Sequence, residues 1–169
     1  MGKADQKLNS GKKRYQVVPR SLIFLRNGDD VLLLKGAPTK RLWANMYNGV
    51  GGHIEVDEDI YSAAQRELHE ETGLAVDQLK LRAITNLDAG SEDQGIMIFV
   101  FVGWTADRQT RASVEGSLHW LPVAELADQP LVEDLHWLLP KLFADDRFYY
   151  LHYSYDEQDK LVIREQASD

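Results

Sequence analysis

Three glutamates near the middle of the chain have a spacing that is costly unless a cation binds them. Glu67, Glu70 and Glu71 stand at positions i, i+3 and i+4, so in a helix their carboxylates share one face. Like charges at this spacing cost roughly 0.2–0.5 kcal/mol per pair, and the negative end of the helix dipole adds roughly 0.3–1 kcal/mol each. Arg66 and His69 offset only part of this repulsion. A divalent cation would offset nearly all of it, so the spacing favours a metal site over a solvated acidic face.

A helix over residues 59–72 must position these glutamates. Ile60, Ala64 and Leu68 recur at i, i+4 and i+8, which gives the helix an apolar stripe that can pack on a sheet. Acidic residues precede the first turn, where negative charge is favourable, and Gly73 follows the last turn as a C-terminal cap. The sequence therefore predicts a helix with one face on a sheet and the glutamates on the opposite face.

The residues around the glutamates form a longer motif, GHIEVDEDIYSAAQRELHEETGL, over positions 52–74. Nine of its positions have a fixed spacing: Gly52, Glu58, Arg66, Glu67, Leu68, Glu70, Glu71, Gly73 and Leu74. This 23-residue pattern resembles the Nudix box and matches it at every fixed position. Nine spaced positions are far more specific than a glycine-rich turn alone.

The resemblance implies a fold and a reaction. Nudix hydrolases are α/β/α sandwiches with a mixed central sheet between helices, and they hydrolyse a nucleoside diphosphate linked to another group, X. By the same resemblance, Glu67, Glu70 and Glu71 would bind Mg²⁺ or Mn²⁺, with the Gly52 carbonyl as a further ligand. Glu115 matches another metal-binding glutamate of the family, although an exposed loop glutamate of no special role is the alternative.

Two other box residues have implied roles. Arg66 would orient one of the glutamates through a charge-assisted hydrogen bond. Glu58 matches the box, and its role stays open between a structural one and one behind the metal ligands.

The metal also has a physical rationale. A pyrophosphate carries several negative charges, which an acidic helix alone would repel. Mg²⁺ prefers oxygen ligands and is usually held by a few carboxylates together with substrate phosphates. It can neutralise the phosphates and acidify a bound water, while one glutamate serves as general base. We therefore expect no turnover without metal.

Length and charge restrict the class of function. A chain of 169 residues suits one domain, and its formal net charge of −8 argues against a surface that binds duplex nucleic acid. The absence of cysteine excludes disulfides and thiolate metal sites. Neither a membrane span nor a secretory signal is predicted. We expect a cytoplasmic protein with a small-molecule nucleotide substrate, and the sequence makes no prediction about its oligomeric state.

Residues 14–169 are expected to form a single domain behind a flexible tail of residues 1–13. A second helix is predicted over residues 132–144, with Pro140 expected to kink or break it. Strands are predicted over residues 15–25, 31–35, 76–87, 96–105, 117–121, 148–155 and 161–165, the last two forming a C-terminal β-hairpin. The apolar run at 96–102 indicates a strand that is buried on both faces.

The identity of the nucleotide must come from residues outside the box. Residues 85–95 lack the proline and tyrosine markers of some Nudix subfamilies. The chain is most similar to the MutT-like group, which includes 8-oxo-dGTP diphosphatases. Residues 47–52 resemble a W-N-G-F-G-G run whose asparagine contacts the purine, so Asn48 would bind the base edge. The alternative for Asn48 is a role in stabilising a turn.

The resemblance implies a second contact to the base. Glu133 and Asp134 are similar to an acid pair that hydrogen-bonds the purine, and paired carboxyl groups suit the donors of a guanine-like or oxidised base. The alternative is that both acids only favour the dipole of the following helix. Leu131 stands where the family has a stacking tryptophan, so that aromatic contact is missing. The four tryptophans are expected to pack in the core or at its rim, and Trp43, in the loop before the box, is the best candidate for an exception that stacks on the ligand.

Three functions remain open. The leading prediction is hydrolysis of a (deoxy)nucleoside triphosphate, including one with an oxidised purine, to the monophosphate and pyrophosphate. The second is hydrolysis of ADP-ribose or another nucleoside diphosphate linked to X. The third is a non-catalytic Nudix-fold nucleotide-binding module, against which the intact segment at 66–71 argues.

Overall fold

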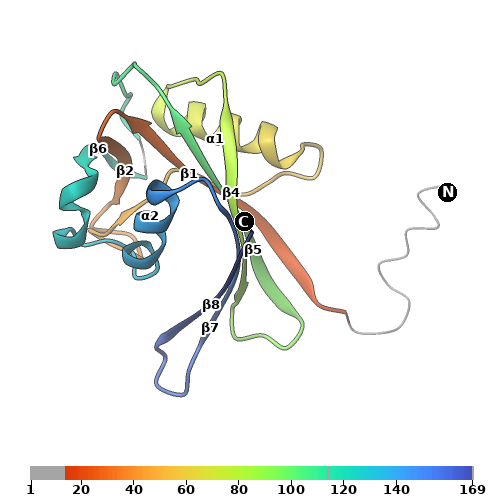
Figure 1. Cartoon of the computed structure of the whole chain (residues 1–169). Helices are drawn as coiled ribbons and strands as arrows, with labels where there is room; N and C mark the ends of the chain where they lie inside the picture. The colour runs from red at the N-terminus through yellow and green to blue at the C-terminus, as the bar shows by residue number, and fades with distance from the viewer. Residues whose placement is uncertain (1–13, 114, 169) are drawn as a thin grey trace.

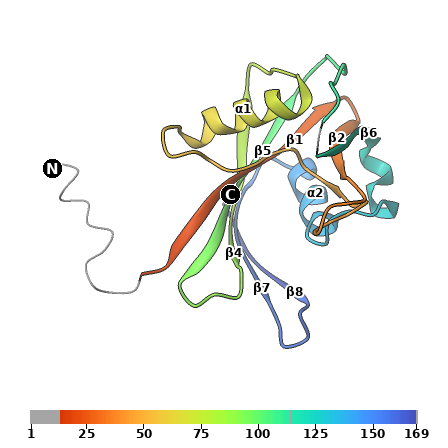
Figure 2. The same ribbon diagram turned by 180° about the vertical axis from the view of Figure 1, so that it is seen from behind.

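The computed structural model describes residues 14–113 and 115–168, and the predicted tail at 1–13 lies outside this part (Figure 1). A mixed sheet forms the centre of the molecule. Helix α1 (Ile60–Thr72) covers one face of the sheet and helix α2 (Leu135–Ala144) covers the other (Figures 1 and 2). The predicted Nudix-type sandwich, with its mixed sheet and C-terminal β-hairpin, is confirmed.

Eight strands form this sheet in the described part of the chain. Their bounds are β1 Gln16–Asn27, β2 Asp30–Gly36, β3 Tyr47–Asn48, β4 Leu79–Asp88, β5 Gln94–Trp104, β6 Gly116–Pro122, β7 Phe148–Tyr155 and β8 Leu161–Ser168. The order is β3-β2-β1-β5-β4-β7-β8, with β6 paired to β2. Strand β1 runs parallel to β5, and β4 runs parallel to β7. All strands except the short β3 lie at predicted segments.

Strand β5 separates the two halves of the core. Val100 and Val102 pack with Phe24 on the face that α2 covers, whereas Phe101 packs with Ile23 on the face that α1 covers. Side chains alternate between the faces of a strand, so residues 100–102 are buried on both sides, as predicted for this strand. The earlier residues 96–99 are only partly buried.

Both ends of α1 are capped as predicted. The Asp59 carboxylate accepts hydrogen bonds from the N–H groups of Tyr61 and Ser62 at 2.8 and 3.0 Å. At the other end Gly73 has φ of 79°, and its N–H donates to the His69 carbonyl at 2.8 Å. A left-handed glycine at this position ends a helix without strain. These caps fix where the acidic face of the helix stops.

Helix α2 differs from its prediction in two respects. It begins at Leu135 rather than 132, because residues 132–134 form a turn in which the Leu135 N–H donates to the Val132 carbonyl. It also runs through Pro140 to Ala144, so the proline does not break it, which was one of its two expected effects. A short 3₁₀ helix, η2 (Val123–Asp128), precedes it. Over the described ranges, no helix is long and apolar enough to cross a membrane.

The buried guanidinium of Arg82, from β4, holds the C-terminal end of α2. It donates to the carbonyls of Leu142, Asp145 and Arg147 at distances from 2.5 to 3.2 Å. Carbonyls at a helix C-terminus have no partners within the helix, so one side chain satisfies several of them. This contact fixes α2 on the sheet and thereby fixes the position of its N-terminus, where Asp134 lies.

Candidate active site

The acidic face of α1 lies against two glycines of the box. A methyl group built on Gly52 would lie 2.5 Å from Glu67 Oε1, so only glycine fits beside this carboxylate. The Gly51 N–H donates to Glu71 Oε2 at 3.3 Å. The Gly52 carbonyl accepts a hydrogen bond from the Ser21 N–H at 2.9 Å, which leaves a second lone pair free. The Glu67 and Glu71 carboxylates thus both contact the backbone of Gly51 and Gly52.

Arg66 connects the acidic residues of the box. Its Nη1 atom donates to Glu67 Oε1 at 2.9 Å and to Glu70 Oε2 at 3.0 Å. Its Nε and Nη2 atoms form a two-point contact with the Glu58 carboxylate at 3.1 and 2.6 Å, and Nη2 also reaches the His53 carbonyl. Glu58 therefore holds Arg66, and Arg66 holds Glu67 and Glu70. The contact of Glu58 with Arg66 is compatible with both roles that the sequence left open, a structural one and one behind the metal ligands.

Negative charge concentrates around Glu71. Burial first, and then the charges of Glu115 and Glu67, together raise the pKa of this carboxyl to about 7 against the effect of the Gly51 hydrogen bond. Glu115 approaches from the loop before β6, where Lys40 Nζ lies 2.5 Å from its Oε2 atom. Lys40 is the cation that lowers the pKa of Glu71, and its effect is the smallest of these. The cluster therefore carries more negative charge than its neighbours compensate.

This donor set fits a divalent cation. Within the described ranges, no three His, Asp or Glu side chains already form a metal-binding group. The atoms present are nevertheless carboxylate and carbonyl oxygens, which Mg²⁺ and Mn²⁺ prefer. The pKa of Glu71 is raised mainly by burial and also by the charges of Glu115 and Glu67, and a bound cation would oppose both effects. Residues that could hold the ion are Glu67, Glu70, Glu71, Glu115 and the Gly52 carbonyl.

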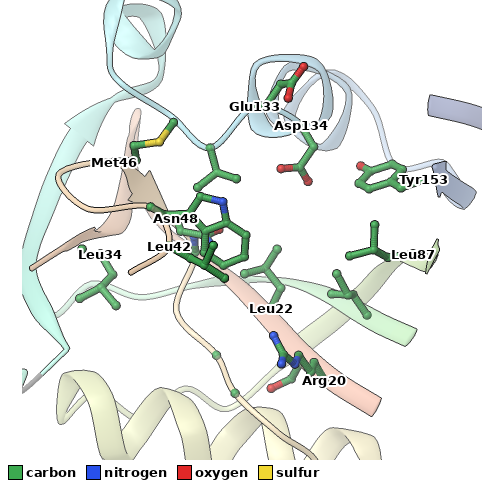
Figure 3. Close-up of a pocket in the computed structure, with 18 of the residues that line it drawn as sticks. Arg20, Leu22, Leu34, Leu42, Met46, Asn48, Leu87, Glu133, Asp134 and Tyr153 are labelled. Atoms are coloured by element: carbon green, nitrogen blue, oxygen red, sulfur yellow. The ribbon is translucent and has the colours of Figure 1, made fainter. Parts of the chain in front are cut away.

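A pocket of about 530 Å³ begins at these glycines and extends across the sheet toward the N-terminus of α2 (Figure 3). Asn48 is one of the residues that line it. Gly51 and Gly52 line it next to Arg20, and Asp134 and Tyr153 lie on the opposite side from Arg20 (Figure 3). The floor between them is mainly apolar, with Leu22, Leu87 and Ile98 among its residues. This volume is typical of small-molecule sites, which are mostly apolar with a few placed polar groups.

Asp134 points into this pocket and does not cap α2 (Figure 3). Burial raises the pKa of its carboxyl to about 6, and the Glu133 charge also raises it, against the effects of its own backbone N–H and of Tyr153. The nearby Tyr153 hydroxyl is buried and close enough to Asp134 to lower the pKa of that carboxyl, but it has full hydrogen-bond geometry with none of the described residues. Two polar groups thus face each other at the apolar end of the pocket without a protein partner that satisfies both.

The other residues singled out in the sequence have different environments. Glu133 lies at the pocket rim and is exposed. Asn48 lines the pocket, but its Oδ1 atom accepts the Gly49 N–H at 2.8 Å, so it also stabilises the local turn. Leu131 is 3% exposed and belongs to the core, whereas Trp43 is about half exposed and lines the pocket. The structure therefore brings Asn48 and Asp134 together and leaves Leu131 outside.

Arg20, Lys40 and Tyr153 are among the pocket residues that the sequence analysis did not single out. Arg20 and Tyr153 lie on β1 and β7, which become neighbours of the same pocket only through the order of the sheet. Of these three residues, only Arg20 had a sequence signal. It is a charged residue two positions before Leu22, and therefore on the same, otherwise apolar, face of the strand.

Comparison with known proteins agrees with this geometry. The family model described as NUDIX domain matches residues 17–144. The oxidized purine nucleoside triphosphate hydrolase of Danio rerio is 27% identical over 117 residues, covering 69% of this chain and 74% of that protein. The NAD-capped RNA hydrolase NudC of Haemophilus influenzae is 30% identical over 139 residues, covering 77% of this chain and 47% of that protein, so this chain spans about half its length.

Among solved structures, a MutT protein from Bacillus halodurans superimposes with a TM-score of 0.76 and 25% sequence identity, over 88% of this chain and 97% of that one. The similarity therefore extends over nearly the whole fold. The matched family model spans most of the chain and contains the complete box, with its glutamates held as described above. The chain belongs to the Nudix family and is a Nudix pyrophosphohydrolase, a hydrolase of nucleoside diphosphates linked to another group.

Proposed function

We propose that the substrate is a (deoxy)nucleoside triphosphate, which the protein hydrolyses to the monophosphate and pyrophosphate. The observation that carries this proposal is one continuous pocket. Gly51 and Gly52 contact Glu71 and Glu67 and also line the pocket, whose far end contains Asp134. A nucleotide can therefore extend from the carboxylates, with its phosphates, to Asp134, with its base.

The acidic cluster would act on the phosphates. Mg²⁺ or Mn²⁺, when bound by Glu67, Glu70, Glu71, Glu115 and the Gly52 carbonyl, would neutralise the phosphate oxygens and acidify water. One of the glutamates would accept the proton of the attacking water. The new bond joins the water oxygen to phosphorus, and the anhydride bond between the α and β phosphates breaks. Arg66 keeps Glu67 and Glu70 oriented throughout.

The far end of the pocket would bind a purine. A carboxyl whose pKa is about 6 can be neutral or ionised near neutral pH, so Asp134 can donate or accept a hydrogen bond. The side-chain amide of Asn48 adds donors to the same pocket. Glu133, exposed at the rim, would contribute through its charge and through contact with a bound base. These groups suit a guanine-like base, including an oxidised one, and the name of the zebrafish relative supports this assignment.

A second candidate keeps the reaction and changes the substrate to ADP-ribose or another nucleoside diphosphate linked to X. Two observations favour it. Leu131 lies in the core, so the stacking contact of the MutT-like purine site is absent there. One relative is named for a capped RNA, which is a substrate other than a free triphosphate. A non-catalytic binding module is less well supported, because the Arg66 network and its carboxylates are intact.

The decisive experiment is a substrate panel with Mg²⁺ that measures pyrophosphate and orthophosphate release separately. The panel contains dGTP, 8-oxo-dGTP, dATP, dCTP, ADP-ribose and diadenosine polyphosphates, each with and without EDTA. We expect metal-dependent release of pyrophosphate from a purine triphosphate. Preference for ADP-ribose or a dinucleotide would replace the first proposal by the second. No cleavage of any compound would leave the binding module as the function.

A further inference from the structure

Arg20 lies on the floor of the pocket, beside the box. It shares a face of β1 with Leu22, since residues two apart point to the same side of a strand. Its backbone forms an antiparallel bridge with His53, the residue after Gly52, so the side chains of Arg20 and His53 are neighbours. Both residues line the pocket. Figure 3 shows Arg20 on the opposite side of the pocket from Asp134.

The Arg20 guanidinium has no acceptor among the residues that the structure describes. Its Nε atom is buried without a hydrogen-bond partner, and no ion pair joins Arg20 to a carboxylate in the described ranges. Elsewhere in the same ranges, Arg66 contacts Glu58 and Arg108 contacts Asp30, each at 2.6 Å. The chain contains 27 acidic and 19 basic residues, so acceptors for an arginine are abundant. A buried donor without an acceptor destabilises the protein, and a ligand that supplies the acceptor would remove this cost.

The chemistry of this position identifies the missing partner. A guanidinium has five N–H donors and no acceptor, and its planar fork matches two oxygens of a phosphate. His53 is exposed beside it and adds an imidazole N–H donor. The Ser21 N–H binds the Gly52 carbonyl at 2.9 Å, so this part of β1 is fixed next to the box segment that contacts Glu67. The phosphate end of a nucleotide is therefore nearer to Arg20 than its base is.

We propose that Arg20 and His53 form an anion subsite, which binds a phosphate group of the nucleotide without requiring the metal. Arg20 is then a positioning residue that places the phosphate chain beside the acidic cluster. This inference rests on the proposed function in one respect, namely that the ligand is a nucleotide. It assigns a direct protein contact to phosphates in a protein whose acidic cluster would otherwise repel them.

The test compares a nucleotide with its nucleoside in the absence of metal. Binding of dGMP and of deoxyguanosine is measured by calorimetry in EDTA at low salt, for the wild-type protein, Arg20→Gln and Arg20→Lys. We expect dGMP to bind the wild type at least about 10-fold more tightly than deoxyguanosine, as one charge-assisted contact allows. Arg20→Gln should reduce this ratio to about 2-fold or less and leave deoxyguanosine affinity unchanged. Arg20→Lys should retain part of the ratio, because it keeps the charge without the fork.

Arg26→Gln is the matched control. Arg26 lies on the same face of β1 and also has a buried Nε atom without a partner, but it stacks on Phe143 outside the pocket. Its substitution should leave the ratio of dGMP to deoxyguanosine affinity at the wild-type value. Thermal unfolding of each variant checks that the fold is retained.

Three results would overturn the subsite. These are failure of dGMP to bind without metal, an unchanged ratio in Arg20→Gln, and an equal loss of dGMP and deoxyguanosine affinity, which would indicate a contact to the base. The substrate panel decides the proposed function separately. If the wild type cleaves no nucleotide but Arg20→Gln still removes the ratio, the subsite stands and hydrolysis fails. If the wild type is active but Arg20→Gln leaves the ratio of dGMP to deoxyguanosine affinity unchanged, hydrolysis stands and the subsite fails.

Discussion

Asp134→Asn should stabilise the folded protein, and the gain should grow with pH. The substitution keeps the size of the side chain and its ability to cap a helix, but it removes the charge. Burial raises the pKa of Asp134 to about 6 from an ordinary value of 3.8. Between these two values the folded protein holds a proton that the unfolded chain releases. The wild type therefore loses stability as pH rises through this window, and the full loss is present above pH 6.

The magnitude follows from the same values. Each pH unit between the two pKa values corresponds to about 1.4 kcal/mol, so the free energy of unfolding of the wild type is lowered by at most about 3 kcal/mol above pH 6. Contact of Asp134 with the solvent in the pocket makes this an upper limit. The Asp134→Asn variant does not lose this stability. Its free energy of unfolding should exceed that of the wild type only slightly near pH 4 and by the largest amount at pH 7 to 8.

Urea denaturation at several pH values between 4.5 and 8 measures this advantage. The difference between variant and wild type is the informative quantity, because other carboxylates change stability equally in both proteins. Glu133→Gln is the matched control, since Glu133 is adjacent but exposed and should give a difference nearly independent of pH. An Asp134→Asn variant that is less stable than the wild type at pH 8 would refute the reasoning. It would mean that the ionised carboxylate stabilises the α2 N-terminus through the helix dipole.

Three further predictions concern catalysis and the fold. Glu71→Gln should lower kcat by at least about 100-fold in the pyrophosphate-release assay with unchanged circular dichroism, and full activity would remove Glu71 from the reacting site. Gly52→Ala should lower kcat/KM by about 10- to 100-fold, because its methyl group displaces the Glu67 carboxylate, and wild-type kinetics would contradict that contact. Arg82→Met should cost about 3 kcal/mol in urea unfolding, since it leaves buried carbonyls unpaired, and a loss under 1 kcal/mol would show that water replaces the guanidinium.

The elements that the sequence predicted well depend on local patterns. Helix α1 has an apolar stripe, an Asp59 cap and a Gly73 stop, and all of these act within a few residues. Strand β5 was identified by an apolar run that needs burial on both faces. The start of α2 was placed three residues too early because residues 132–134 were included in the helix, whereas they form a turn before Leu135.

The pocket could not be predicted in the same way, because its residues meet only through the order of the sheet. Arg20 reaches the site because β1 pairs with β5 and bridges to His53. Tyr153 reaches it because β7 pairs in parallel with β4. Neither pairing has a local sequence signal, since strands that are distant in the chain choose partners through the packing of the whole core. Glu115 was placed in the correct loop, but its partner Lys40 lies in a different loop and had no signal.

The lining of the pocket and the network of the box differ in how their polar groups are paired. Of the five buried side-chain atoms without a partner in the described residues, three belong to pocket residues: Arg20 Nε, Ser21 Oγ and Tyr153 Oη. The box network shows the opposite situation, since the Arg66 guanidinium is bonded to three carboxylates and a carbonyl. A network in which every polar group is paired holds the catalytic groups in one geometry. Such pairing requires particular residue types at fixed spacings, and for this reason the box can be recognised in the sequence. Recognition of the substrate instead needs groups left free for the ligand, and free groups impose no spacing on the chain. The same physical difference explains why the reaction was evident from the sequence and the substrate was not.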